Sequence, residues 1–279
     1  MELLELLRGS RKRESRNDAA LRIQEERRCI LTSKSDFFIR EAYKTLRTNV
    51  TFALAGEGDS RVIVVTSSLQ SEGKSITAIN LALSFAEADK KVLLVDCDLR
   101  RPKIGRLLSV SSFAGLSNLL LDPSLIQKPI FKKFNDIDVL LSGDIPPNPS
   151  ELLGSARMKK LLDQMREKYD CIILDTPPIN MVTDAVVLAP QTDGVLFVVR
   201  ANQSERGAVI HAVDQLEYTH AKLLGFVLNG IDLEKTSYGY GKYRYRKYKK
   251  YGYYGSRYGY GYGYGSQPGQ KQATEQVEQ

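Results

Sequence analysis

This sequence predicts an α/β fold with a mostly parallel sheet flanked by helices. After Arg61, short runs that are apolar throughout alternate with longer stretches of helical periodicity. Strands without polar alternation are typical of a sheet covered on both faces, and alternation with helices indicates parallel strands. The predicted strands span residues 61–66, 91–96, 137–142, 171–175, 194–200 and 223–229.

The chain is long enough for one sizeable domain with further segments at both ends. We expect a helical segment over residues 1–55, a central domain over 56–234 and a tail over 235–279, because the composition changes after Asp232. The apolar runs are far shorter than the roughly 20 residues that span a bilayer. The first residues also lack the order of a signal peptide.

The helices are expected from caps and periodicity. Asn17 or Asp18 can cap a first helix and Asp36 a second, since Asn and Asp are favoured at this position. The turn-forming string AGEGDS, residues 55–60, separates these helices from the first strand. Later helical patterns cover residues 75–89, 151–168, 183–190 and 205–219.

The string SSLQSEGKS, residues 67–75, lies between the first predicted strand and the next helix. It matches the phosphate-binding pattern G-x-x-x-x-G-K-[ST], except that Ser68 stands at the first position. In this pattern, backbone N–H groups surround a phosphate, a lysine contacts it and a hydroxyl binds Mg²⁺. The flanking strand and helix favour this P-loop NTPase interpretation over a chance match in a turn. The predicted nucleotide-binding residues are Ser68, Ser71, Glu72, Gly73, Lys74, Ser75, Ile76 and Asn229.

Three aspartates lie at or just past the ends of predicted strands. Asp96 and Asp98 come at the end of VLLVDCD, and Asp175 ends CIILD. The carboxyl ends of parallel strands share one edge of the sheet, where ligands bind in open α/β folds. A single such aspartate is often a turn residue or helix cap, but three facing one phosphate loop predict a Mg²⁺–nucleotide site.

The tail is rich in tyrosine and in positive charge. Residues 238–264 hold twelve of the fifteen tyrosines, seven basic residues and no acidic residue, which equals the whole formal net charge of +7. With few aliphatic side chains and many glycines, the tail cannot offset its ordering entropy, and we expect disorder. The tyrosines are Tyr238, Tyr240, Tyr243, Tyr245, Tyr248, Tyr251, Tyr253, Tyr254, Tyr258, Tyr260, Tyr262 and Tyr264.

Together these motifs resemble the deviant-Walker ATPases related to bacterial partitioning and division-site proteins. Four strings and the tyrosine cluster are more specifically similar to the bacterial tyrosine autokinases of capsule and exopolysaccharide export. The resemblance covers roughly residues 36–264. The strings are EAYKTLRTN (41–49), VDCDLRRP (95–102), GDIPPNPSELL (143–153) and DTPPINMVTDA (175–185).

This resemblance implies an ATP- and Mg²⁺-dependent kinase that phosphorylates its own tyrosine cluster in trans and regulates polysaccharide synthesis and export. Lys74 would stabilise the transferring phosphoryl group, and Ser75, Asp98 and Asp175 would hold Mg²⁺. Asp96 would accept the phenol proton, with Asp98 as the alternative base. Arg100 and Arg101 would act either as phosphate clamps or as partners of acidic neighbours.

The resemblance also implies partners. The family's oligomerisation motif E-x-x-R-x-x-R reads Glu41, Lys44 and Arg47 here, which predicts a homo-oligomeric ring with each tail in a neighbour's active site. We expect a membrane polysaccharide co-polymerase as a separate activating chain, a tyrosine phosphatase and no nucleic acid. The expected location is the cytoplasm, at the inner face of the bacterial plasma membrane.

The chain departs from these patterns at the phosphate loop. Leu69 stands where the deviant-Walker ATPases usually carry a second lysine. Gln70 and Ser71 replace the Pro-Gly usual in the kinases, and a serine does not adopt positive φ freely. Two other functions stay open at this point: a partitioning-type ATPase whose basic tail binds DNA or membrane, and a catalytically weak scaffold.

Overall fold

A computed structural model of the chain describes residues 21–56, 58 and 60–231. Within these residues, seven strands form one sheet in the order β3-β4-β2-β5-β1-β6-β7. All neighbouring pairs are parallel except β3 and β4. The strands are β1 (Arg61–Ser67), β2 (Val92–Asp96), β3 (Phe131–Phe134), β4 (Ile137–Leu140), β5 (Cys171–Asp175), β6 (Gly194–Arg200) and β7 (Leu223–Asn229).

The six predicted strands and the mostly parallel sheet are confirmed, and one strand was missed. β3 has the sequence FKKF and none of its residues is buried, so it lacks the apolar run that marks the others. It forms an antiparallel hairpin with β4 at the edge of the sheet. Edge strands commonly carry lysine, and this makes them hard to recognise by hydropathy.

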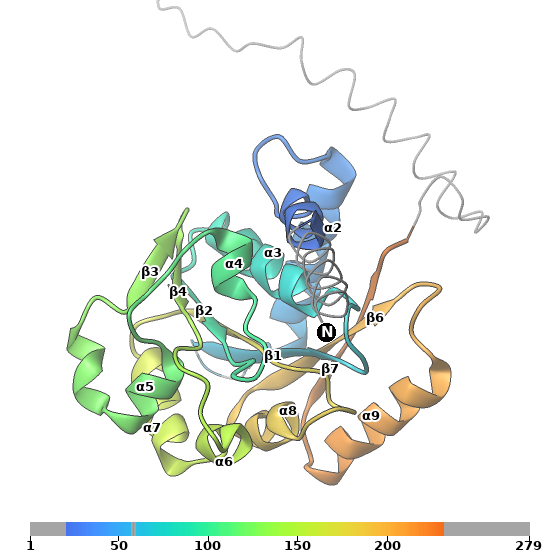
Figure 1. Cartoon of the computed structure of the whole chain (residues 1–279). Helices are drawn as coiled ribbons and strands as arrows, with labels where there is room; N and C mark the ends of the chain where they lie inside the picture. The colour runs from blue at the N-terminus through green and yellow to red at the C-terminus, as the bar shows by residue number, and fades with distance from the viewer. Residues whose placement is uncertain (1–20, 57, 59, 232–279) are drawn as a thin grey trace, which may run out of the picture. The chain divides into compact units, whose positions relative to one another are not determined.

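Helices cover both faces of the sheet (Figure 1). Buried side chains of α2, α3 and α4 pack in one core, and those of α5 to α9 pack in the other. The first group is α2 (Phe37–Ala53), α3 (Lys74–Ala86) and α4 (Ile104–Leu108). The second is α5 (Leu116–Leu121), α6 (Pro149–Leu153), α7 (Ala156–Arg166), α8 (Asp184–Leu188) and α9 (Arg206–Tyr218), with 3₁₀ turns η1 (Pro123–Gln127) and η2 (Ala189–Gln191).

The prediction of one continuous helix over residues 151–168 is wrong, because this region forms two helices. It is divided into α6 and α7, because Gly154 ends the first helix and the Ser155 side chain caps the second by accepting from Met158 N. The cap predicted at Asp36 is confirmed, since its carboxylate accepts from Phe38 N. The short helices α4 and α5 were not predicted.

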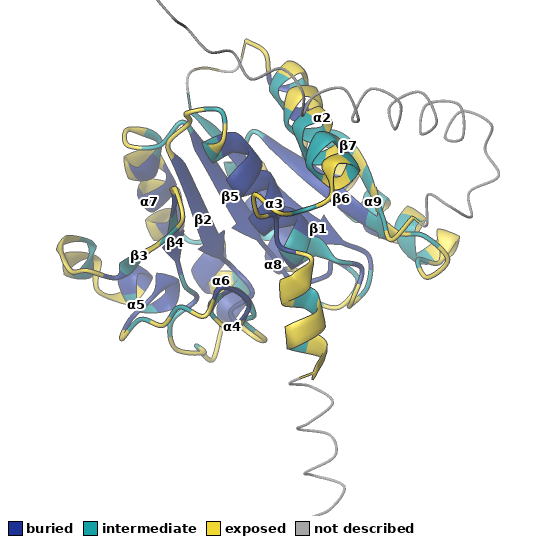
Figure 2. Ribbon diagram, turned by 90° about the horizontal axis from the view of Figure 1, so that it is seen from above, coloured by how far each residue is buried: buried dark blue, intermediate teal, exposed yellow. Residues whose placement is uncertain are grey.

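Burial explains why the strands are apolar throughout. Every residue of β2 and β5 is buried, and Figure 2 shows buried residues throughout the middle of the sheet. Since both faces of these strands meet helices, neither face needs polar side chains. In the same sheet, β5 lies between β1 and β2, and this order brings the carboxyl ends of three strands together.

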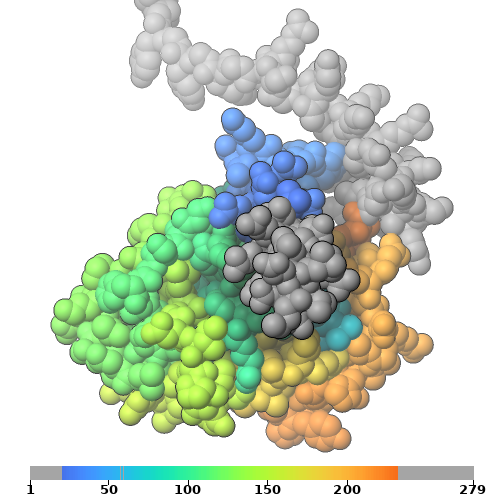
Figure 3. Space-filling model, viewed as in Figure 1, coloured from blue at the N-terminus to red at the C-terminus, as the bar shows by residue number. Residues whose placement is uncertain are grey.

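The described N-terminal residues lie against α4. Lys103 Nζ is 3.3 Å from Glu26 Oε1, and the Arg27 guanidinium donates to the carbonyl oxygen of Arg106. In Figure 3 the blue N-terminal residues adjoin the teal and green surface of the chain that follows α3. These residues also contact α3, where the Asn80 side chain accepts a hydrogen bond from Leu31 N and donates one to the carbonyl oxygen of Cys29.

Several predictions lie outside the described residues. They concern the cap at Asn17 or Asp18, the disorder of the tail and all twelve tyrosines from Tyr238 to Tyr264. Among the described helices, none combines the length and apolar character that a bilayer crossing requires.

Candidate functional site

The phosphate-loop string connects β1 to α3 through residues 68–73. Ser71 has φ 64° and Gly73 has φ 96°, so two positions adopt the left-handed region. The strain expected from a serine at position 71 is therefore present, and such a conformation costs a non-glycine residue roughly 1–2 kcal/mol. Lys74 then begins α3, with the loop's backbone N–H groups at the helix N-terminus, where anions bind.

Asn229, at the end of β7, packs against this loop. Its Nδ2 donates to the carbonyl oxygen of Glu72 at 3.0 Å, and its Oδ1 accepts from Gly230 N at 2.8 Å. A Cβ on Gly73 would lie 1.9 Å from Asn229 Nδ2, so only glycine fits there. The structure thus brings Asn229 to the predicted site, where its amide supports the loop backbone.

Glu72 connects the loop to the turn that follows β6. Its side chain is buried and accepts hydrogen bonds from Ser68 Oγ at 2.9 Å, from Leu69 N at 2.8 Å and from Ser204 Oγ. Arg200 adds a bond from its guanidinium to the carbonyl oxygen of Ser71. Sequence reasoning missed Ser204 and Arg200, because nothing in the string RANQSERG marks it as a neighbour of the P-loop.

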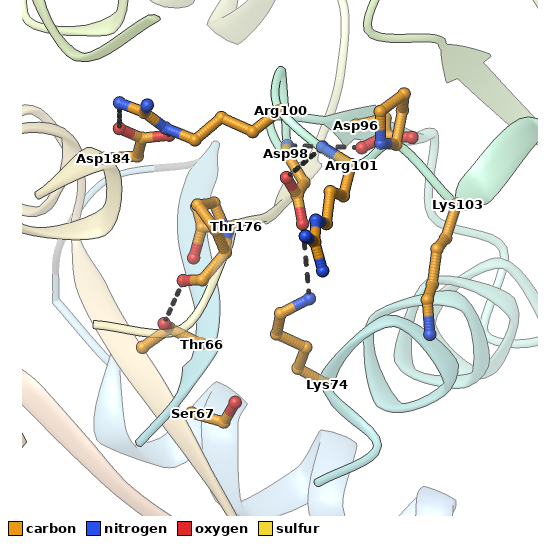
Figure 4. A network of polar contacts seen from close by, with 12 residues as sticks. Thr66, Ser67, Lys74, Asp96, Asp98, Arg100, Arg101, Lys103, Thr176 and Asp184 are labelled. Carbon is orange, nitrogen blue, oxygen red and sulfur yellow. Dashed lines mark hydrogen bonds and ion pairs between the residues drawn. The ribbon is translucent and has the colours of Figure 1, made fainter. Parts of the chain in front are cut away.

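The three predicted aspartates meet beside Lys74. In the sheet register Asp96 pairs with Asp175, and Val65, two residues before the end of β1, pairs with Asp175 from the other side. Lys74 Nζ lies 3.7 Å from Asp98 Oδ2 (Figure 4). All three carboxylates are buried, so their mutual repulsion and desolvation make this a strained cluster of negative charge.

Asp175 has the feature that fits a cation. Both of its carboxylate oxygens are buried, and within the described part of the chain neither makes a hydrogen bond of ordinary distance and angle. Burial raises the pKa of Asp175 above its usual range, although the charge of Lys74 and the nearby Ser75 hydroxyl oppose the shift. Buried polar groups without partners are rare and costly, so this carboxylate is prepared for a ligand.

The donor set suits Mg²⁺ and a nucleotide rather than a metal held by protein alone. Ser75, Asp98 and Asp175 offer hard oxygen ligands. No cluster of three or more His, Cys, Asp or Glu side chains able to hold a metal occurs in the described ranges. Mg²⁺ typically takes one or two carboxylates and completes its shell with waters and phosphate oxygens, and the site agrees with that pattern.

Asp96 and Asp98 have different surroundings. The oxygens of Asp96 accept from the backbone N–H groups of Asp98 and Ile104, at 3.3 and 3.1 Å. Burial, together with the neighbouring Asp175, holds the pKa of Asp96 well above its usual range. Asp96 also lines a cavity of about 350 Å³, which α4 and the segments 110–114 and 141–144 complete.

The two arginines after Asp98 behave differently. Arg100 forms a fork to Asp184 at the start of α8, which agrees with a partner of an acidic neighbour. Figure 4 shows the Arg101 side chain pointing toward the space beside Lys74 and Asp98. Arg101 therefore lies closer to where a phosphate would bind than Arg100 does.

The predicted oligomerisation residues make contacts within the chain. Lys44 Nζ pairs with Glu41 Oε1 at 2.7 Å along α2. The Arg47 guanidinium donates to the carbonyl oxygen of Ser84 on α3. Because α2 packs on α3 through Arg47, this residue also fixes the helix to its own domain.

Comparisons with known proteins agree with this architecture. The model of the AAA domain family matches residues 60–224, more than half of the chain. The chain is also 39% identical over 218 residues to tyrosine-protein kinase YwqD of Bacillus subtilis (strain 168), and the match covers 78% of this chain and 86% of that protein.

The chain belongs to the bacterial tyrosine kinase family.

Solved structures of this family have the same fold. The chimerical protein CapA2B2 is 39% identical with a TM-score of 0.64, covering 70% of this chain and 85% of that one. The kinase domain of the Escherichia coli tyrosine kinase ETK is 31% identical with a TM-score of 0.66, covering 82% and 80%. The resemblance inferred from the four strings and the tyrosine cluster is thereby confirmed.

Proposed function

We propose that this chain is an ATP-dependent protein-tyrosine kinase that phosphorylates its own tyrosine cluster, residues 238–264. One observation carries the proposal: Lys74 lies at the start of α3, directly opposite Asp98 and next to the unpartnered carboxylate of Asp175. A positive side chain, a helix N-terminus and buried carboxylates together form a site for a triphosphate and its metal ion.

The binding roles follow from these positions. The loop residues Ser68, Ser71, Glu72 and Gly73, with Ile76 in the first turn of α3, would surround the phosphates with their backbone N–H groups. Lys74 would contact the β and γ oxygens. Ser75, Asp98 and Asp175 would hold Mg²⁺, which supplies positive charge against the phosphate oxygens. Asn229 would act through the loop, whose backbone it supports.

Transfer requires little beyond position and electrostatics. The phenol oxygen of a tyrosine attacks the γ-phosphorus of ATP, the bond from that phosphorus to the β–γ bridging oxygen breaks, and ADP leaves. Asp96 accepts the phenol proton, and its raised pKa makes it a stronger base than an exposed carboxylate. Asp98, whose Oδ2 faces Lys74, is the alternative base.

The tail is the proposed acceptor. Its charge of +7 complements a site that contains three aspartates and the phosphates of ATP. The composition of the tail predicts a flexible chain, and about 30 residues of such a chain have an average reach near 30 Å. On that expectation the tail of one subunit can enter the site of a neighbour in a homo-oligomer. Each phosphate adds roughly −1.5 to −2 charges, and about four would cancel the tail's excess.

The cellular setting is proposed from the family. We expect regulation of capsular or exopolysaccharide synthesis and export, with a separate membrane co-polymerase as activator and a tyrosine phosphatase that reverses the modification. The kinase would then act at the inner face of the plasma membrane.

Replacing Lys74 tests the function. Purified Lys74→Met protein, incubated with ATP and Mg²⁺, is expected to show no phosphotyrosine while its thermal unfolding stays cooperative. The matched control is Lys159→Met, at an exposed lysine of α7, which should label like wild type. If Lys74→Met keeps wild-type labelling, or if wild type itself never labels, the kinase proposal is wrong.

A further inference from the structure

The strings LRRP, PPNPSELL and DTPPINMVTDA meet at one buried carboxylate. Asp184 has no exposed surface, and its two oxygens accept from Arg100 Nε and Arg100 Nη2, each at 3.0 Å. Ser150 on α6 donates to the same carboxylate at 2.6 Å and accepts from Arg100 Nη2 and from the Thr183 hydroxyl. A buried charge needs such partners.

Arg100 lies two residues after Asp98, in a segment without regular structure. Three other hydrogen bonds of this segment are local, since Asp98 N donates to Asp96, Arg101 N donates to Asp98, and Ile104 N donates to Asp96. Two reach further: Cys97 N donates to the carbonyl oxygen of Asp175 at 2.8 Å, and Lys103 Nζ contacts Glu26. None of these bonds attaches the segment to the layer of α6 and α8. The Arg100 fork makes that attachment, as Figure 4 shows.

The Arg100–Asp184 fork therefore connects the two segments that carry Asp98 and Asp175, the carboxylates proposed to hold Mg²⁺. Arg100 belongs to the turn that carries Asp98, and Asp184 follows Asp175 by nine residues through the segment between β5 and α8. A planar guanidinium that makes two parallel hydrogen bonds allows little rotation. Any shift of the Asp98 turn relative to β5 would disturb these bonds.

We propose that Arg100 and Asp184 are positioning residues, which hold Asp98 opposite Lys74 and at a set distance from Asp175; this inference rests on the proposed function. The alternative is that Arg100 contacts a phosphate directly. That role would require Arg100 to leave Asp184, and the buried carboxylate would then lose both of its charged hydrogen bonds.

Three variants separate the two roles. Arg100→Lys keeps the charge but loses the fork, Asp184→Asn keeps the shape but removes the charge, and the double variant combines them. The matched control is Arg166→Lys, because Arg166 makes a similar fork, at 2.7 and 2.8 Å, to Asp193 directly before β6, at the amino ends of the strands. For each protein, kcat and KM for ATP are measured with a tyrosine peptide, together with thermal unfolding.

A positioning role predicts a specific pattern. Each single variant should lose about 10- to 100-fold in kcat, as supporting residues typically do, with KM for ATP changed less than kcat. The double variant should lose no more than the larger single loss, because one interaction is removed either way. Arg166→Lys should lose comparable stability yet keep wild-type kcat.

Other outcomes overturn the inference. If Asp184→Asn keeps wild-type kcat, or if Arg100→Lys mainly raises KM for ATP, Arg100 acts on phosphate instead. If Asp184→Asn does not fold, Arg100→Lys and Arg100→Gln decide the question, since the Arg100 side chain is 38% exposed. An inactive wild-type protein would contradict the proposed function itself, whereas an active wild type with active variants contradicts only the positioning role.

Discussion

The guanidinium of Arg200 donates a hydrogen bond of 3.0 Å to the carbonyl oxygen of Ser71. Ser71 is the one non-glycine residue of the loop with positive φ, 64°, and the last residue of β6 supports the loop at that position. The strain of such a conformation persists only where surrounding contacts hold it. Here Asn229 bonds the carbonyl oxygen of Glu72 after Ser71, and the Glu72 carboxylate bonds Ser68 and Leu69 before it.

Ser71→Gly is expected to stabilise the protein and tighten nucleotide binding. Glycine adopts positive φ without a Cβ penalty, so the unfolding free energy should rise by about 0.5–1 kcal/mol. Denaturant unfolding and titration with a fluorescent ATP analogue measure the two effects. Ser109→Gly is the matched control, since Ser109 has φ 58° at the end of α4. It should gain stability without a change in affinity, and equal affinities for all three proteins would contradict the prediction.

Ser204→Ala is expected to weaken ATP binding more than it weakens the fold. The change removes a donor to the buried carboxylate of Glu72, and hydrogen bonds to charged groups contribute about 1.5–3 kcal/mol. Isothermal titration with ATP and Mg²⁺ measures the loss, which should be about tenfold or more. In the control Ser60→Ala, the lost bond is to the carbonyl oxygen of Tyr169, near the amino ends of the strands. An unchanged affinity in Ser204→Ala would show that the loop needs no such support.

Asp175→Asn is expected to stabilise the ligand-free protein at pH 7, because it removes a buried charge whose oxygens make no well-formed hydrogen bond. A gain of about 1–2 kcal/mol is typical for relieving a buried polar group without a partner, and it should raise Tm by about 2–8 °C. Thermal unfolding in EDTA measures the gain, with Asp163→Asn on the exposed side of α7 as control. The same variant should lose the stabilisation that ATP and Mg²⁺ give wild type.

The gain from Asp175→Asn should also depend on pH. The folded-state pKa of Asp175 is raised above 3.8, so the folded protein keeps a proton that the unfolded chain releases. Wild-type stability from this group is therefore present below pH 3.8 and is lost as pH rises through the folded-state pKa. The difference between variant and wild type should be smallest near pH 3 and should increase toward pH 7. If the stability difference between Asp175→Asn and wild type shrinks as pH rises, the raised folded-state pKa of Asp175 is contradicted.

Phosphorylation is expected to occur between subunits. Lys74→Met protein with an intact tail is mixed with active protein truncated after Lys235, and ATP and Mg²⁺ are added. The full-length inactive partner should become labelled, because only its tail carries the tyrosine cluster. Lys74→Met protein alone is the control and should stay unlabelled. If the mixture labels no full-length chain under conditions where wild type labels itself, transfer occurs within one subunit.

The features that could be predicted from the sequence alone are those that depend on residues close together in the chain. The strand cores of β1, β2 and β5 are apolar throughout because both faces are buried, and hydropathy detects that directly. The P-loop string, the Asp36 cap and the strand-end aspartates are likewise short patterns whose function depends on adjacent residues. Even the strain at Ser71 could be predicted, because it concerns one residue in a known loop.

Only the tertiary structure decided which distant residues meet. Asp184 lies 84 residues from Arg100, and Ser204 lies 132 residues from Glu72. Their positions depend on strand order, which places β5 between β1 and β2 and β6 beside β1. Hydropathy and caps act over a few residues, whereas strand order depends on the packing free energy of the whole sheet. For that reason the sequence predicted three aspartates at one edge, but the register that pairs Asp96 with Asp175 appeared only in the folded chain.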